Sequence, residues 1–255
     1  MKNESPLEII FDLLNKYDEE GKNYESFEKI RDKDILFPTE LFNERWLMKI
    51  FLFLAKEKKF KNVSYIPNPD KYGSLRYVSE VAIGALTEQG NTKADGLIGT
   101  FEFLKKSKVT LNNNNGKQCL YFYEAKMYSP LSSKTTNTGD NQIERYLKNA
   151  QNIGNNKHID KKFILIYPKD VKIKFNQNGS EEIREWVNCK EELLKMTTET
   201  IKKKYDIDDI DILFISWEEI KSDINDSNYN EQFTKFYDIC LKTNKIKAVK
   251  WPLNF

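Results

Sequence analysis

The sequence is poor in the residues that bind zinc and form disulfides. Its 255 residues include one histidine, His158, and only three cysteines, Cys119, Cys189 and Cys240. The cysteines lie far apart and form no Cys-x-x-Cys pair, and one histidine cannot complete a usual zinc site. Zinc sites and disulfide frameworks are therefore disfavoured, and so are nucleases that depend on a histidine base. His158 lies in a polar segment, where we expect it to be exposed.

Long apolar runs and nucleotide-binding loops are missing as well. No stretch approaches 18 residues without a charge, and the opening MKNESP lacks the pattern of a signal peptide. The glycines of Gly96-Leu-Ile-Gly99 lack the lysine and the spacing of a phosphate-binding loop. No repeat, helix-turn-helix or zinc finger is recognisable. We therefore expect a soluble, cytoplasmic protein without a membrane partner.

Acidic residues are scarce in one part of the chain. The composition is that of a globular protein, with 39% hydrophobic and 13% aromatic residues, and the formal net charge is only +2. Residues 103–139, however, contain six lysines and a single acid, Glu124. This distribution favours a polyanionic partner such as nucleic acid. For any one cluster, the alternative is a solvated lysine face in a protein rich in lysine and asparagine.

That single acid lies in an apolar and aromatic run, residues 119–127 (CLYFYEAKM), which predicts a buried strand. Side chains alternate along a strand, so Glu124 and Lys126 share one face and Ala125 points the other way. Residues 92–100 predict an earlier strand, and the asparagine-rich segment between the two predicts a turn. A hairpin of this kind would place Asp95 beside Glu124.

Two carboxylates in this position need a cation or a shared proton. At about 4 Å they repel by roughly 4 kcal/mol at an effective dielectric constant of about 20. Mg²⁺, or Mn²⁺ in its place, suits a site of oxygen ligands and keeps bound waters, one of which could act as a nucleophile. Lys126, on the same face as Glu124, could position that water and offset negative charge on a phosphate. The pattern indicates a metal-dependent phosphodiesterase.

The segment after Lys126 predicts substrate contacts. A hydroxyl-rich loop comes first, and Asp140 then caps a helix. Its apolar residues are spaced i, i+3, i+4, i+7 and predict a buried face: Ile143, Tyr146, Leu147 and Ala150. Gln142 and Arg145 lie in the first turns of this helix, where a phosphate is favoured. If nucleic acid is bound by loops, the best candidates are the segment from Lys105 to Lys117 and the loop from Ser129 to Thr138. Within these, we expect the substrate-binding residues to include Lys117, Ser132 and Lys134.

The order Asp95, Glu124-x-Lys126 and a helix opening with Gln142 resembles the PD-(D/E)XK nuclease superfamily, the restriction-endonuclease-like fold. The proline that commonly precedes the aspartate is replaced by Ala94. The resemblance implies that Asp95, Glu124, Lys126 and Gln142 are catalytic. It also implies that a metal is held at Asp95, Glu124 and Ala125, with a further acid supplied by the helix before the sheet.

Two residues compete for that third carboxylate. Glu44 lies in a strongly apolar predicted helix with apolar neighbours at i−3, i+3 and i+4, so it is the preferred metal ligand. Glu80 lies on the predicted strand 77–84 and could contribute only if that strand pairs beside Asp95 in the right register. Glu80 is therefore the alternative acid.

The element order predicts an α/β fold with a mixed central β-sheet flanked by helices, as in a restriction-endonuclease-like core. We expect residues 1–36 to form an accessory helical segment and residues 37–255 to form the nuclease domain with a C-terminal helical extension. The expected activity is Mg²⁺-dependent cleavage of nucleic acid, DNA before RNA, in restriction or phage defence, with a homodimer as one arrangement. Two alternatives remain: an inactive nucleic-acid-binding or scaffold module, and a structural protein whose charged residues pair with each other.

Overall fold

A computed structural model of the chain describes residues 44–61, 63–82, 93–104, 108–111, 116–127, 142–151, 159–169, 172–177, 180–185, 200 and 202–250. Its elements, in chain order, are α4 (Glu44–Lys56), α5 (Pro69–Tyr72), β1 (Arg76–Ala82), β2 (Lys93–Gly99), β3 (Phe101–Leu104), β4 (Lys108–Leu111), β5 (Gln118–Ala125), α6 (Gln142–Gln151), β6 (Ile159–Tyr167), β7 (Lys172–Gln177), β8 (Ser180–Glu185), α8 (Lys202–Tyr205), β9 (Ile210–Ser216), α9 (Trp217–Asp223) and α10 (Ser227–Lys250).

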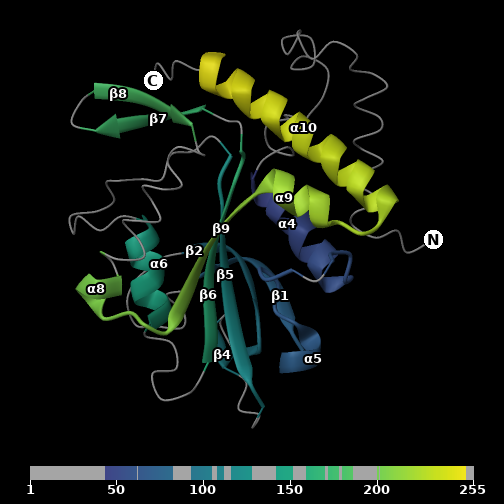
Figure 1. The fold of residues 1–255 in the computed structure, drawn as a ribbon, viewed down its shortest axis with the longest axis vertical. Coiled ribbons are helices and arrows are strands. Elements are labelled where there is room, and N and C mark those ends of the chain that lie inside the picture. The colour runs from purple at the N-terminus through teal and green to yellow at the C-terminus, as the bar shows by residue number, and fades with distance from the viewer. Residues whose placement is uncertain are drawn as a thin grey trace.

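The predicted α/β fold with a mixed central sheet between helices is confirmed. Five strands lie in the order β1-β2-β5-β6-β9; the pairs β1–β2 and β2–β5 are antiparallel, and β5–β6 and β6–β9 are parallel. Helices α6 and α8 lie on one side of this sheet, and α4, α9 and α10 lie on the other (Figure 1). The central strand β5 is therefore covered on both faces, which explains why its sequence is apolar almost throughout.

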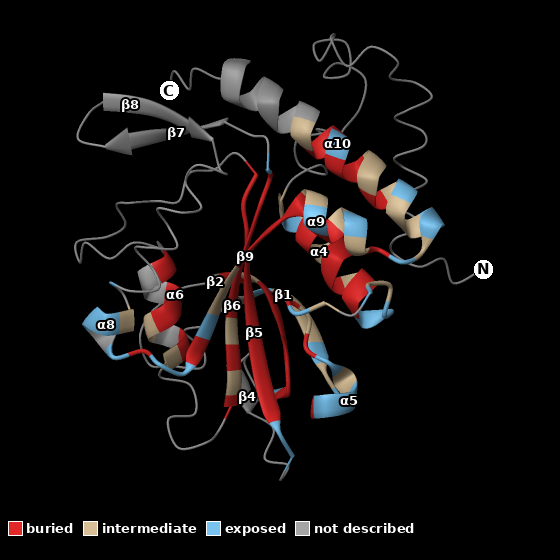
Figure 2. Ribbon diagram, in the orientation of Figure 1, coloured by how far each residue is buried: buried red, intermediate tan, exposed pale blue. Residues whose placement is uncertain are grey.

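Strand β5 divides its side chains between two hydrophobic cores. Tyr121 and Tyr123 join the core that includes α4, α9 and α10, whereas Leu120 and Phe122 join the core that includes α6. All eight residues of β5 are buried, as the continuous red of this strand shows (Figure 2). The alternation places Glu124 on the α6 side, beside the apolar side chains of that core.

Helix α4 approaches the sheet closely because a glycine admits it. A Cβ atom at Gly96 of β2 would lie 2.8 Å from Sδ of Met48, closer than packed atoms tolerate. Met48 is fully buried and lies one helical turn after Glu44, so the contact at Gly96 draws the first turn of α4 toward β2. Gly96 therefore helps to bring Glu44 near Asp95, the residue that precedes Gly96 in β2.

One predicted element is wrong, and the connection between β2 and β5 contains more than the predicted turn. Within it β3 and β4 pair with each other, and the asparagine run 112–115 lies outside the described residues. The apolar residues Ile183, Trp186, Val187, Leu193 and Leu194 predict a helix, but Ile183 lies in β8, which pairs with β7 in a two-stranded sheet of the described residues. Strand β8 (SEEIRE) contains one apolar residue, so its own sequence shows no period of two, and pairing with β7 defines it as a strand. Residues 186–199 lie outside the described residues, as do residues 1–43, which include the predicted accessory helical segment.

Strand β1 contains an unusual backbone conformation. Ser79 pairs with Gly96 and Val81 pairs with Ala94, so Glu80 occupies the position opposite Asp95. Glu80 has φ = 55°, in the left-handed region, which costs a non-glycine residue about 1 kcal/mol.

Among the described helices, none is long and apolar enough to cross a membrane.

Candidate active site

The site begins where strands β2 and β5 part. Their pairing runs from Gly99↔Leu120 to Gly96↔Tyr123 and stops, although both strands continue. Beyond this point the Asp95 carboxylate, rather than the β2 main chain, accepts the N–H of Ala125, with a distance of 2.8 Å to Oδ2. The sheet therefore forks here: β2 and β5 diverge, and the Asp95 carboxylate lies between the two strands.

Each of three successive main-chain N–H groups at the end of β5 has a different partner. The N–H of Ala125 donates to Asp95, that of Lys126 donates to the carbonyl of Ile166 on β6 at 2.8 Å, and that of Met127 donates to Oε2 of Glu44 at 3.2 Å. The carbonyl of Lys126 also accepts the indole N–H of Trp217 at 3.1 Å. The turn out of β5 is therefore held from β2, β6, α4 and α9, and the side chains nearby have a rigid support.

Glu124 and Lys126 form a buried ion pair. Lys126 Nζ lies 2.6 Å from Oε1 of Glu124, with side-chain exposures of 7% and 3%. The phenol of Tyr146, on α6, donates to the other oxygen, Oε2, at 2.6 Å. A buried carboxylate that accepts two such donors is strongly held and oriented. The predicted placement of Glu124 and Lys126 on one face agrees with this contact.

The pKa of Asp95 is raised by its burial and by the negative charges around it. Burial, followed by the neighbouring charge of Glu124, raises the pKa of Asp95 from 3.8 to about 7; Glu44 adds to this, while the Ala125 N–H and the Lys126 charge oppose it. Burial alone would lower the pKa of Lys126, but Glu124, Glu44 and Asp95 outweigh it and raise that pKa above its ordinary value. Three carboxylates and one ammonium group therefore act on one another here.

The two candidates for the third acid lie in different surroundings. Glu44 accepts the N–H of Met127 and acts electrostatically on both Asp95 and Lys126. Glu80 is opposite Asp95 in the register, but its side chain is 41% exposed and pairs with Arg45 at 3.3 Å. The geometry therefore associates Glu44 with the cluster.

Other predicted substrate residues are distributed differently. Because α6 connects the parallel strands β5 and β6, it runs back along the sheet and its first residue, Gln142, begins near the end of β5 that carries Glu124. The side chains of Gln142 and Arg145 lie outside the described residues, as does the loop with Ser132 and Lys134. Lys117 precedes β5 at its opposite end, about 20 Å along the strand from Glu124, so the fold does not bring it to the site.

Tyr146 is the site residue that the sequence pattern assigned only to packing. It is 2% exposed, and its ring packs on Phe163 with 5.5 Å between ring centroids. The available signal was its hydroxyl, because a tyrosine on the buried face of an amphipathic helix needs a polar partner. Glu124, the only acid of the neighbouring strand, was the obvious one.

Tyr146→Phe should weaken the site without disturbing its packing. The ring contact with Phe163 is kept while Glu124 loses one donor, so we expect the free energy of unfolding to fall by about 1–2 kcal/mol and any metal-dependent activity to fall about tenfold. Urea unfolding and turnover measurements test both. Equal stability and activity in the variant and the parent protein would show that this hydrogen bond has no role.

A hard divalent cation fits the donors present, although they are not gathered into a ready site. Among the described residues, no group of three or more histidine, cysteine, aspartate or glutamate side chains is arranged to hold a metal. Within the same residues Asp95 Oδ1 accepts no hydrogen bond, and the carboxylates of Glu124 and Glu44 add further oxygen atoms at the same turn. The N–H and C=O of a strand residue point the same way, so the Ala125 carbonyl also faces the fork. These oxygen donors suit Mg²⁺ or Mn²⁺.

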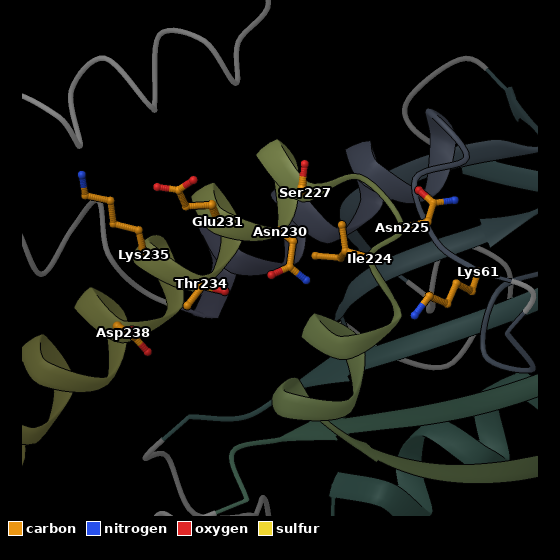
Figure 3. Close-up of a pocket in the computed structure, with 9 residues that line it drawn as sticks. All are labelled: Lys61, Ile224, Asn225, Ser227, Asn230, Glu231, Thr234, Lys235 and Asp238. Carbon is orange, nitrogen blue, oxygen red and sulfur yellow. The ribbon is translucent and has the colours of Figure 1, made fainter.

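A separate pocket lies along α10 and the segment before it (Figure 3). Its charged lining residues are two lysines, Lys61 and Lys235, and two acids, Glu231 and Asp238. None of the candidate site residues lines it, and its charges are balanced. It therefore offers no focused field for a charged ligand.

A scan against models of known protein families finds no match to the sequence, and a search of curated proteins finds no significant match. The residues of the site and their geometry therefore carry the functional assignment.

Proposed function

We propose that the protein is a metal-dependent nuclease that hydrolyses phosphodiester bonds, DNA before RNA, on a restriction-endonuclease-like core. The observation that carries this proposal is the cluster at the fork of β2 and β5. Asp95, Glu124, Lys126 and Glu44 come from three different elements and meet at one turn, in the chain order and strand placement of the PD-(D/E)XK pattern. A restriction or defence setting, a homodimer and a cytoplasmic location belong to the same proposal.

The residues divide into a binding group and a catalytic group. Asp95 and Glu124, with the Ala125 main chain and Glu44, would hold Mg²⁺ or Mn²⁺. When bound, such a cation supplies positive charge at the scissile phosphate and makes a bound water more acidic. Lys126 is held charged by its carboxylate neighbours and would stabilise the negative charge that develops on the phosphate. Gln142 and Arg145 would contact the substrate from the start of α6.

Rigid support makes these assignments chemically reasonable. The Lys126 N–H donates a hydrogen bond to the Ile166 carbonyl, and the Lys126 carbonyl accepts one from the Trp217 indole. The main chain that carries the ammonium group is therefore fixed in position. Glu124 is oriented by Tyr146 as well as by Lys126. Charges that are already in place need little rearrangement when the substrate arrives, and this arrangement is what makes electrostatic catalysis effective.

Cleavage assays test the proposal directly. The purified protein is incubated with single-stranded, duplex and supercoiled DNA and with RNA, in Mg²⁺, in Mn²⁺ and in EDTA. We expect cleavage of at least one nucleic acid that requires the divalent cation and is lost in Glu124→Gln. Metal-independent cleavage, undiminished cleavage by Glu124→Gln, or no cleavage of any of these substrates would contradict the proposal.

A structural role for the same residues is the competing explanation. Both oxygens of Glu124 already accept a donor, as they would in a charge network that only stabilises the sheet. Buried ion pairs often contribute little net stability, however, because desolvation offsets the attraction. If the network were purely structural, divalent cations would change neither the melting temperature nor any reaction.

The third carboxylate gives a further prediction. Glu44→Gln keeps an acceptor for the Met127 N–H and removes one charge, so the fold should persist while the affinity for Mg²⁺ falls about tenfold. Glu80→Gln breaks only an exposed pair and should leave metal affinity unchanged. Isothermal titration of Mg²⁺ into both variants decides between them. A loss of metal affinity in Glu80→Gln with none in Glu44→Gln would move the third acid to β1.

A further inference from the structure

An exposed arginine lies beside the candidate site. Arg45 follows Glu44 in the first turn of α4, and Glu44 is bonded to the turn that carries Lys126. The Arg45 side chain is 68% exposed, and its Nε lies 3.3 Å from Oε1 of Glu80. One helical turn later, Lys49 adds a second cation at i+4, over the ring of Trp46. Positive charge thus continues along α4 away from the carboxylate cluster.

Glu80, the partner of Arg45, is held in an unfavourable backbone conformation. Its φ of 55° lies in the left-handed region, and the other described non-glycine residues with positive φ, Lys58 and Asp206, lie in turns rather than in a strand. Exposed ion pairs contribute little to stability, so the contact with Arg45 does not by itself account for the strain. Strain of this kind collects at binding and switch positions.

We propose that Arg45 binds a phosphate of the nucleic-acid backbone next to the cluster, and that Glu80 occupies this guanidinium in the free protein as a substitute for the phosphate. The proposal rests on the proposed function and assigns one contact within it. A guanidinium can donate two parallel N–H groups to one phosphate, and Nε of Arg45, which lies 3.3 Å from Oε1 of Glu80, is one of the donors that such a contact uses. Binding of the substrate would then release Glu80.

The chemistry predicts opposite effects for the two partners. Arg45→Gln removes a phosphate contact, so it should weaken nucleic-acid binding about tenfold at 0.1 M salt and reduce the slope of log affinity against log salt by about one. Glu80→Gln removes the competing carboxylate, so it should tighten binding about threefold. The tightening should vanish in the Arg45→Gln/Glu80→Gln double variant, because it acts only through Arg45.

Fluorescence anisotropy in EDTA measures these affinities without cleavage. The probes are fluorescein-labelled DNA and RNA of one sequence, each a duplex with a single-stranded tail, so the two arms show which backbone supplies the phosphate. The matched control is Arg76→Gln, which removes an exposed arginine from the opposite end of β1 and should change the affinity much less.

Three results would overturn the inference. The first is an unchanged affinity and salt slope in Arg45→Gln, and the second is a threefold tightening by Glu80→Gln that persists without Arg45, which would be a general charge effect. The third is a wild-type protein that binds neither probe at low salt. The cleavage assay decides separately whether the nuclease proposal stands, so cleavage with an unchanged Arg45→Gln affinity would reject this contact alone.

Discussion

Lys126→Met should reduce cleavage at least a hundredfold, which corresponds to about 3 kcal/mol of lost transition-state stabilisation. Methionine keeps the length and apolar stem of the side chain but not its charge. The ammonium group lies 2.6 Å from Oε1 of Glu124, and Glu124, Glu44 and Asp95 raise its pKa and keep it charged, so the substitution removes a positive charge from the carboxylate cluster. Single-turnover kinetics should show the loss in the chemical step, with substrate affinity nearly retained.

Lys161 provides the matched control for this variant. It is equally buried, on β6, and pairs with Asp209 at 2.7 Å, outside the candidate site. Lys161→Met should therefore lower stability and leave the cleavage rate per folded molecule unchanged. Lys126→Arg, which keeps the charge but replaces a compact group by a planar fork, should restore folding better than activity. A Lys126→Met variant that cleaves at nearly the wild-type rate would remove Lys126 from the mechanism.

Asp95→Asn should stabilise the metal-free protein by about 2 kcal/mol at pH 8 and abolish the stabilisation by Mg²⁺. Asparagine keeps an acceptor for the Ala125 N–H and removes the charge that Glu124 repels. In the wild-type protein, Mg²⁺ at a hundred times its dissociation constant should add about 2.7 kcal/mol through preferential binding to the folded state. Thermal unfolding in EDTA and in Mg²⁺ measures both effects.

The difference in stability between Asp95→Asn and the wild-type protein depends on pH because the Asp95 carboxyl group titrates. The folded protein holds this proton more tightly than the unfolded chain, because the pKa rises from 3.8 to about 7. The contribution of Asp95 to stability is therefore fully present below about pH 4 and is lost as the pH rises through 7. The advantage of Asp95→Asn should be near zero at pH 4, grow between pH 4 and 7, and level off above it.

Asp160 is the control with the opposite sign. Burial raises the pKa of Asp160, but hydrogen bonds from Tyr72 and Lys71 outweigh it, so this pKa lies below its usual value. Its contribution is present above the unfolded pKa, and Asp160→Asn should lower stability at neutral pH. Asp160→Asn should leave the response to Mg²⁺ unchanged, because Asp160 lies outside the candidate site. A metal response that survives Asp95→Asn, or a stability difference that does not change with pH, would contradict the role given to Asp95.

Local patterns in the sequence were enough to place several elements and one part of the site. Alternation along the apolar run of β5 predicted that Glu124 and Lys126 share a face, and helical spacing predicted the buried residues of α6, with Tyr146 among them. These features depend on residues two to four positions apart, and strand and helix geometry relates such residues directly. The same information predicted a mixed sheet between helices.

Tertiary structure decided that these charged residues lie close together. The fork between β2 and β5 lets the Asp95 carboxylate take the Ala125 N–H, and the close contact of Met48 with Gly96 brings Glu44 to the same turn. Neither follows from spacing, because strand register and helix approach depend on packing between segments far apart in the chain.

Glu124 and Glu80 also separate what local sequence predicts from what tertiary packing decides. Glu124 was predictable as a buried acid, but its second donor, Tyr146, comes from a helix whose rotation is set by the core around Phe163. Glu80 satisfied the register that its candidacy required, yet it is exposed and paired with Arg45. The sequence by itself determined which charged residues lie on which strand or helix, because periodicity is local. Only the tertiary structure decided which of them are neighbours, because burial, desolvation and charge coupling arise once the elements pack together.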